Sequence, residues 1–340
     1  MKFVSYNKNG GDRAGLLINN KIYDLEKCSA EMHKNLPATM GEFLKGEDDF
    51  MSIAAELQKE IEEGTEFDSL EADTVKLLAP VTHPTSCRDG YAFRQHVSTA
   101  RRNRGVDMIP EFDQFPIFYL TNHNAVFGEG NIILEKDHFE KLDFELEAAI
   151  VIGKRGKNIT AKDADNYIAG YMIMNDLSAR RLQMEEMKLN LGPAKGKDFA
   201  TTIGPWLVTP DELEQYKIQT NSGNKYNLTM TAFHNGKQVS KGNMKDMNWS
   251  FAEIIERASY GVELLPGDVI GSGTVGTGCY LELNGTWAIQ AKEKNNEFTP
   301  VWIQPGDTME LEIEALGRLK NTMILSNKNY SILAKKKNVK

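Results

Sequence analysis

Two glutamates at the start of an apolar stretch are the first residues that could do chemistry. Glu145 and Glu147 alternate with Phe144 and Leu146, and residues 148–152 are all apolar. Alternate side chains of a strand share one face, so both carboxylates are expected to point the same way. A strand that is apolar on both faces is buried, and two like charges at its start need a compensating cation. The pattern predicts a pair of metal ligands.

The alternating acidic pattern alone is more often a solvated strand face. Residues 309–317 provide the comparison, because Glu310, Glu312 and Glu314 alternate there with apolar residues throughout. That pattern is typical of a strand with one wet acidic face. The apolar residues on both faces after Glu147 are what favour a metal site there.

Asp176 is the next candidate, at the junction between a strand-like GYMIM segment and a helix expected over residues 177–188. Arg180 and Gln183 follow at spacings that would place all three side chains on one helix face. An acid, a guanidinium and an amide together suit a metal beside a carboxylate-bearing ligand. The competing interpretation is that Asp176 is a helix N-cap.

A third segment, residues 87–102, combines Asp89 before a turn glycine with His96 on a helix expected over residues 92–103. Tyr91 and Arg94 lie between them. A single histidine is often structural or simply exposed, so this segment alone decides nothing.

Two glycine-rich loops fail the tests for nucleotide binding. The GPAKGKD segment at 192–198 is one residue short of a P-loop, and Asp198 replaces the metal-binding hydroxyl. Lys197 and Thr201 could still place a cation and a hydroxyl against an anionic substrate. The GSGTVG segment at 271–276 should open a helix if it bound a dinucleotide, but the following CYLELNG and TWAIQA segments, which include Glu282, are expected to be strands. We expect a close backbone approach there.

The elements that must position these residues predict a β-rich α+β fold. Residues 1–75 are expected to form a small α+β domain, with strands at MKFVSY, GLLINN and KIYDL and a helical pattern at 39–63, before a VKLLAPV strand. Residues 76–335 contain many strand patterns and few helices, at 92–103, 161–166, 177–188 and 250–259, without sustained βαβ alternation. Residues 336–340 are a basic tail.

Composition narrows the function classes. The 340 residues carry a formal net charge of −8, which argues against nucleic-acid binding. The three cysteines include no CxxC pair, which argues against a disulfide scaffold and against zinc. No apolar run approaches the roughly 20 residues of a membrane helix, and no secretory signal is visible. We therefore expect a cytoplasmic protein without a membrane partner.

Taken in order, the segments at 89–96, 144–147, 175–183, 196–206, 265–274, 281–283 and 306–317 resemble the fumarylacetoacetate hydrolase superfamily. The resemblance covers roughly residues 80 to 325. It implies a catalytic domain built as a mixed β-sandwich roll, usually dimeric, behind a smaller N-terminal domain. It also implies one divalent cation held by Asp89, Glu145, Glu147 and Asp176, and such oxygen ligands suit Mg²⁺, Ca²⁺ or Mn²⁺.

The resemblance further implies roles for other side chains. His96 and Glu282 would form the general base that activates water. Arg180, Gln183 and Lys197 would stabilise the oxyanion or the leaving enolate, and substrate contacts would come from Tyr91, Tyr119, Thr201 and Thr274. Met187 replaces a substrate-facing tyrosine of fumarylacetoacetases, and the segment after Tyr119 also differs from theirs.

These implications lead to a homodimeric, metal-dependent hydrolase that cleaves a carbon–carbon bond in a small anionic oxo acid. The substrate would be a 1,3-diketo acid, either fumarylacetoacetate-like or acylpyruvate-like, as in the catabolism of aromatic compounds. One alternative is a 2-oxo acid decarboxylase of the oxaloacetate type or a hydratase, which should not need His96. Another alternative is a non-catalytic metal or ligand binder on the same fold.

Overall fold

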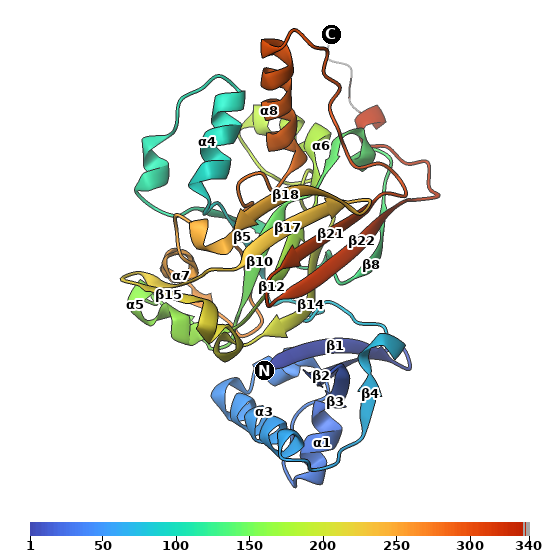
Figure 1. Cartoon of the computed structure of the whole chain (residues 1–340), viewed down its shortest axis with the longest axis vertical. Helices are drawn as coiled ribbons and strands as arrows, with labels where there is room; N and C mark the ends of the chain where they lie inside the picture. The colour runs from blue at the N-terminus through green and yellow to red at the C-terminus, as the bar shows by residue number, and fades with distance from the viewer. Residues whose placement is uncertain (336, 338–340) are drawn as a thin grey trace.

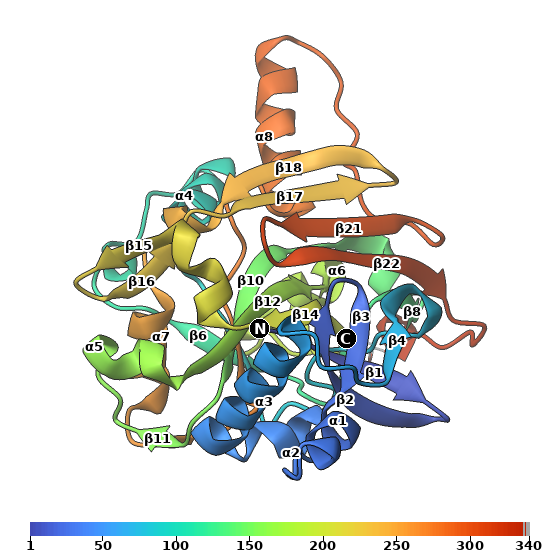
Figure 2. The same ribbon diagram turned by 60° about the horizontal axis from the view of Figure 1, so that its bottom comes forward.

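The computed structural model describes residues 1–335 and 337, so most of the basic tail at 336–340 lies outside the described residues. The chain begins with β1 (Lys2–Lys8), β2 (Gly11–Ile18), β3 (Lys21–Asp24), α1 (Leu25–Glu31), α2 (Met40–Leu44), α3 (Glu47–Glu62) and β4 (Ser69–Glu71). The three helices lie beside the β1–β2–β3 strands (Figure 2). The hairpins turn at Asn9, Asn19 and Asn20, which have positive φ angles, as the Asn-rich turn sequences predict.

The N-terminal strands continue a large mixed sheet. Its strands after β1 are β5 (Cys87–Gly90), β6 (Phe118–Thr121), β7 (Val126–Phe127), β10 (Leu146–Ile152), β12 (Ile168–Asp176), β14 (Thr201–Val208) and β20 (Val269–Gly271). The order is β4-β3-β2-β1-β14-β12-β10-β20-β5-β6, with β7 beside β14. Phe3 of β1 pairs with Leu207 of β14. Strands β10 and β12 are buried along their whole length, as the apolar stretch predicted for β10.

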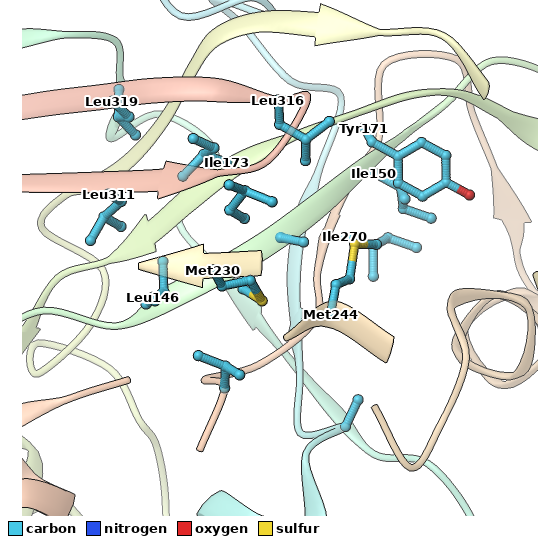
Figure 3. Close-up of a cluster of buried hydrophobic side chains, with 14 of the residues drawn as sticks. Leu146, Ile150, Tyr171, Ile173, Met230, Met244, Ile270, Leu311, Leu316 and Leu319 are labelled. Carbon is cyan, nitrogen blue, oxygen red and sulfur yellow. The ribbon is translucent and has the colours of Figure 1, made fainter. Parts of the chain in front are cut away.

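A second sheet covers one face of the first (Figures 1 and 2). It has the order β18-β17-β21-β22-β8 and consists of β8 (Gly130–Leu134), β17 (Thr229–His234), β18 (Lys237–Asn243), β21 (Thr308–Ile313) and β22 (Gly317–Leu325). Figure 3 shows Leu146, Ile150 and Ile173 of the large sheet packed with Met230, Leu311 and Leu319 of the second. The fold is therefore the strand-rich α+β sandwich that the sequence predicts.

The remaining elements are short, apart from three helices. Two-stranded ladders join β9 (Leu142–Asp143) to β13 (Ser178–Ala179), β11 (Gly156–Lys157) to β19 (Glu263–Leu264), and β15 (Lys217–Thr220) to β16 (Gly223–Tyr226). The later helices are α4 (Arg94–Asn103), α5 (Ala161–Ala164), α6 (Arg180–Glu186), α7 (Phe251–Ser259) and α8 (Tyr280–Glu293). The 3₁₀ helices are η1 (Ala72–Thr74), η2 (Pro110–Asp113), η3 (His138–Lys141), η4 (Asp165–Tyr167), η5 (Met187–Leu189), η6 (Pro210–Tyr216), η7 (Met244–Asp246) and η8 (Leu333–Lys335).

Several local expectations were wrong. Residues 279–291, expected as two strands, form most of α8, so Glu282 is helical. The helix expected over 39–63 is two helices that meet at Lys45 and Gly46. VKLLAPV contributes one isolated bridge, between Tyr6 and Leu77, instead of a strand. In the described part of the chain, no helix is both long and apolar enough to cross a bilayer.

Candidate active site

Four carboxylates meet at one end of the large sheet. Asp89 lies near the end of β5, Glu147 at the start of β10 and Asp176 at the end of β12, while Glu145 immediately precedes β10. Because β10 runs antiparallel to β12, the start of one strand lies beside the end of the other. Oxygens of Asp89, Glu145 and Glu147 lie within 4.8 Å of one another. The four predicted metal ligands are all buried.

Two buried cations neutralise part of this charge. Arg180 Nη2 lies 2.7 Å from Glu145 Oε1, and Lys197 Nζ lies 2.7 Å from Asp176 Oδ2 and also contacts Glu145. Burial would raise the pKa of Glu145, but the charges of Lys197 and Arg180 outweigh burial and lower that pKa to about 2. Glu145 is therefore held as a carboxylate.

Within the described part of the chain, no lysine or arginine forms an ion pair with Asp89 or Glu147. Burial, followed by the negative charge of Asp176, raises the pKa of Asp89 to about 7. Burial, followed by the charge of Asp89, raises the pKa of Glu147 well above its ordinary value. Ionising both carboxyls would leave negative charge uncompensated in this part of the cluster, and a bound cation would favour their ionised forms.

Local geometry also fits a divalent cation. Asp176 Oδ1 is buried and has no hydrogen-bond partner among the residues that the structure describes. A Cβ at Gly271 would lie 2.6 Å from Asp89 Oδ1 and 2.9 Å from Glu147 Oε2, so the missing side chain leaves room for these oxygens. Since the four candidate ligands offer only oxygen, they suit Mg²⁺, Ca²⁺ or Mn²⁺ better than zinc.

The GSGTVG loop holds the carboxylates from the other side. The Gly273 amide donates to Asp89 Oδ1 at 3.1 Å and to Glu147 Oε2 at 3.2 Å. Gly273 has a φ of 79°, and a Cβ there would lie 2.6 Å from the carbonyl oxygen of Gly90. The expected close approach is confirmed. Strands were expected after this loop, and that expectation was wrong, because helix α8 follows it. Gly273 of the loop donates its amide to two carboxylates of the cluster.

His96 and Glu282 form a buried pair beside the carboxylate cluster. His96 lies on α4 and Glu282 in the first turn of α8, and His96 Nδ1 lies 2.7 Å from Glu282 Oε2. The side chains are 9% and 2% exposed. This contact occupies Nδ1 and leaves Nε2 as the remaining ring nitrogen of a side chain that lines the cavity.

Asp143 is a functional residue that the sequence analysis missed. It is completely buried and accepts hydrogen bonds from Arg180 Nε at 2.8 Å and from the amides of Tyr280 and Leu281 at 2.6 and 2.9 Å. Its carboxylate thus positions Arg180 and the start of α8. A signal was present, because Asp143 precedes Glu145 by two residues and continues the same alternation.

The site opens into a cavity of about 820 Å³. Of the predicted site residues, those lining it are Asp89, Tyr91, His96, Tyr119, Glu145, Arg180, Gln183, Lys197 and Thr274. Glu147, Asp176 and Glu282 lie behind that layer and contact it. Thr201 is buried on β14, paired with Asp176, and does not line the cavity.

Asp176 is linked to Arg180 through Lys197 and Glu145, instead of sharing a helix face with Arg180 and Gln183. Asp176 ends β12 and accepts a hydrogen bond from the Tyr119 hydroxyl, while α6 begins at Arg180 with Ala179 as its N-cap. Asp176 is therefore not a helix N-cap. Arg180 Nη1 donates to Gln183 Oε1 at 2.9 Å. Arg94 is exposed and pairs with Asp113, away from the cavity.

A two-sheet sandwich with a carboxylate cluster and a histidine–glutamate pair beside one cavity defines an enzyme class rather than a structural module. Residues 85–324 match the family model described as fumarylacetoacetate (FAA) hydrolase C-terminal. The chain belongs to this family.

Relatives in the family have different names. The chain is 30% identical over 344 residues to oxaloacetate tautomerase YisK of Bacillus subtilis (strain 168), covering 94% of this chain and 99% of that protein. It is 30% identical over 283 residues to the fumarylacetoacetase of Oryza sativa subsp. japonica, covering 70% and 63% respectively. The structure of a fumarylacetoacetate hydrolase from Exiguobacterium antarcticum superposes with a TM-score of 0.66 at 24% identity, covering 96% of this chain and 100% of that one. That likeness shows the shared fold.

Proposed function

We propose that this chain is a divalent-metal-dependent hydrolase that cleaves a carbon–carbon bond in a 1,3-diketo acid. The observation that carries the proposal is the 2.7 Å contact between His96 and Glu282, two buried side chains beside the carboxylate cluster. A carboxylate that orients an imidazole through one nitrogen leaves the other nitrogen to accept a proton from water. Hydrolysis needs that activated water.

For an acylpyruvate, the balanced reaction is R–CO–CH₂–CO–COO⁻ plus water giving R–COOH and CH₃–CO–COO⁻. The oxygen of water bonds to the acyl carbon, and the bond from that carbon to the CH₂ group breaks. His96 takes a proton from the water, and a proton returns to the departing carbon. A cation bound to the four carboxylates would supply Lewis-acid polarisation of the diketone.

The side chains around the cluster have separate tasks in this scheme. Glu282 holds the His96 ring in one orientation through Nδ1. Arg180 and Lys197 lie at the cavity wall with their charges fixed by Asp143, Glu145 and Asp176. They can stabilise negative charge on the departing enolate, as fixed cations do in a site that excludes water. Gln183, which hydrogen-bonds Arg180, limits the movement of that guanidinium.

A second candidate is keto–enol tautomerisation of oxaloacetate. It is favoured by the name of the Bacillus subtilis relative, which aligns with 94% of this chain. That reaction moves a proton between carbon and oxygen and consumes no water. The same cavity supplies a proton acceptor, His96, and fixed positive charges, so the two activities must be separated by experiment.

The test measures diketo-acid absorbance and product formation for acylpyruvates and fumarylacetoacetate, with Mg²⁺ and then with EDTA. We expect metal-dependent cleavage into two acids, and we expect His96→Ala to slow it by about 100- to 10,000-fold, the usual contribution of a general base. His83→Ala, which changes an exposed histidine, is the matched control. Acceleration of oxaloacetate enol conversion without cleavage of any diketo acid would replace the hydrolase proposal with the tautomerase.

The homodimer implied by the family resemblance stays a proposal. Light scattering coupled to gel filtration measures the molar mass directly. A mass near twice 38.2 kDa would support it, and a mass near 38.2 kDa would contradict it.

A further inference from the structure

The cavity has two chemically different ends. The carboxylate cluster, His96, Arg180 and Lys197 occupy one end. Apolar side chains form most of the remaining wall: Phe118, Met184, Met187, Leu281, Phe298 and Trp302. They come from β6, α6, η5, α8 and the segment that follows α8, and Figure 1 places α4, α6 and α8 at the same end of the molecule. A ligand that fills the cavity must touch both ends.

Part of the apolar wall is uncovered by protein. Met184 and Met187 are 39% and 46% exposed, and Ile117, which also lines the cavity, is 53% exposed. Burying such side chains against an apolar group removes their surface from water and is favourable. Methionine side chains adapt to differently shaped partners, so this wall suits a family of related groups.

The positive charges of the cavity are unevenly placed. Among the described residues that line it, Arg104, Arg180 and Lys197 carry permanent positive charge. Arg180 and Lys197 are held by buried carboxylates. Arg104 is exposed, and its Nε donates to the carbonyl oxygen of Ala100 at 3.1 Å. A second substrate carboxylate would find this one rim cation. The amide groups of Asn103 and Asn284 also line the cavity, but they already donate to the carbonyl oxygens of Glu282 and Val301. Most of the remaining wall is apolar, and burying a carboxylate against it is costly.

We propose that the substrate is an acylpyruvate with an apolar alkyl or aryl acyl arm, instead of a dicarboxylic acid such as fumarylacetoacetate. This inference rests on the proposed function and specifies the substrate class of the same site. The 2-oxo carboxylate end lies at the carboxylate cluster with its cation and fixed guanidinium, and the acyl arm lies against Met184, Met187 and Trp302.

The experiment compares kcat/KM of the Mg²⁺-loaded wild-type protein for acetyl-, butanoyl-, hexanoyl- and benzoylpyruvate and for fumarylacetoacetate. We expect kcat/KM to rise about fourfold for each methylene that becomes buried, the gain that burial of a CH₂ group gives. Fumarylacetoacetate should be the slowest of the larger substrates. Titration calorimetry of the same ligands with the Mg²⁺-loaded His96→Ala variant measures affinity without turnover.

Two variants test whether the preference for a long apolar arm arises at the cavity wall that contains Met187. Met187→Glu should lower the ratio of hexanoylpyruvate to acetylpyruvate kcat/KM by tenfold or more, because it places a charge against the apolar arm. Leu189→Glu is the matched control, since Leu189 lies in the same 3₁₀ turn, is 81% exposed and does not line the cavity. It should leave that ratio unchanged.

The outcomes separate this inference from the proposed function. Cleavage with a flat or falling series would overturn the apolar arm and keep the hydrolase. So would preferred cleavage of fumarylacetoacetate that Arg104→Ala selectively removes. If no diketo acid is cleaved, the hydrolase proposal fails, and the calorimetric series then decides: affinity that rises with arm length supports the apolar site, and unchanged affinity rejects it.

Discussion

Asp143 accepts a hydrogen bond from Nε of Arg180 at 2.8 Å, and both side chains are almost completely removed from solvent. The same carboxylate accepts the first two backbone N–H groups of α8, at Tyr280 and Leu281. An anion at a helix N-terminus is favourable because those amides have no partner within the helix. Since α8 carries Glu282, this one carboxylate fixes both the cation at the cavity wall and the partner of His96.

Asp143→Asn should therefore damage both stability and turnover. Removing one partner of a buried ion pair leaves Arg180 with less compensation, and we expect a loss of about 3 kcal/mol or more in the free energy of unfolding. A shift of Arg180 and α8 by about 1 Å should lower kcat about 100-fold, more than it changes KM. Urea unfolding and steady-state kinetics, made well below the melting temperature of the variant, measure the two effects.

Asp268→Asn is the matched control for that variant. Asp268 is also buried, lies 3.5 Å from an arginine, Arg88, and accepts the Leu265 amide, but Arg88, unlike Arg180, does not line the cavity. It should lower stability while leaving kcat of the folded protein unchanged. Equal losses of kcat in the two variants would show that Asp143 acts through general stability alone.

The contact between Asp143 and α8 also explains why the local sequence pattern predicted a strand where α8 forms. Leu281, Glu282 and Leu283 alternate apolar and polar residues, which is typical of a strand. The helix instead starts there because Cys279 is extended and a carboxylate 137 residues earlier in the chain accepts the amide of Tyr280. Such a cap is invisible to any window of neighbouring residues. Glu282 was therefore assigned to the site through family resemblance, while the strand predicted to contain it was wrong.

Other parts of the site could be predicted from the sequence because the pattern lies within a few neighbouring residues. The apolar residues after Glu147 predicted a strand buried on both faces, and β10 is that strand. The strand with one acidic face, predicted at residues 309–317, was also recognisable from the sequence. It forms β21, whose burial alternates residue by residue, and Glu310 and Glu312 pair with Arg318. The meeting of β5, β10 and β12 depends on long-range strand order, which periodicity does not contain.

Glu147→Gln tests the cation site through stability. For the wild type, Mg²⁺ or Mn²⁺ at about 100 times its dissociation constant should add about 2.7 kcal/mol to the free energy of unfolding. The substituted glutamine would be neutral and similar in size, so the metal-free variant should be as stable as the metal-free wild type, and the added stability should be lost. Thermal unfolding with metal and with EDTA measures both quantities.

Glu310→Gln provides the control for that measurement, because Glu310 belongs to the other alternating acidic strand, which lies in the second sheet, while the cluster lies on the large sheet. It should keep the full metal-dependent shift. A shift that survives Glu147→Gln but responds to Glu310→Gln would place the cation elsewhere.

Asp24 should contribute a pH-dependent part of the stability. It accepts hydrogen bonds from Tyr6 Oη at 2.6 Å and Arg13 Nε at 2.8 Å, and it caps α1 through the Lys27 amide. Burial would raise its pKa, but the hydrogen bonds from Arg13 and Tyr6 outweigh burial and lower it. A carboxyl with a lowered folded-state pKa stabilises the fold above its unfolded pKa of about 3.9, and loses that effect as pH falls through the folded value.

Asp24→Asn should thus cost about 1.5–3 kcal/mol at pH 7, the usual contribution of hydrogen bonds to a charged group. The difference from wild type should shrink as the pH falls below about 4. Urea unfolding between pH 7 and pH 3 measures it. Glu42→Gln, which changes an exposed acid paired with Lys45, should give no measurable difference at either pH. A penalty for Asp24→Asn that stays constant with pH would contradict the lowered pKa.

Gly271→Ala tests whether the close approach of backbone and carboxylates serves the cation. The new methyl group would lie 2.6 Å from Asp89 Oδ1, 2.9 Å from Glu147 Oε2 and 2.8 Å from Met174 Sδ, so at least one carboxylate must move. Changes that misplace ligands typically lower metal affinity about 10- to 100-fold, and titration calorimetry with Mn²⁺ measures that loss. Gly41→Ala is the control, because a Cβ there meets no atom within 4 Å and Gly41 lies in α2 and does not line the cavity. Wild-type Mn²⁺ affinity in Gly271→Ala would mean that Asp89 and Glu147 do not jointly hold the ion.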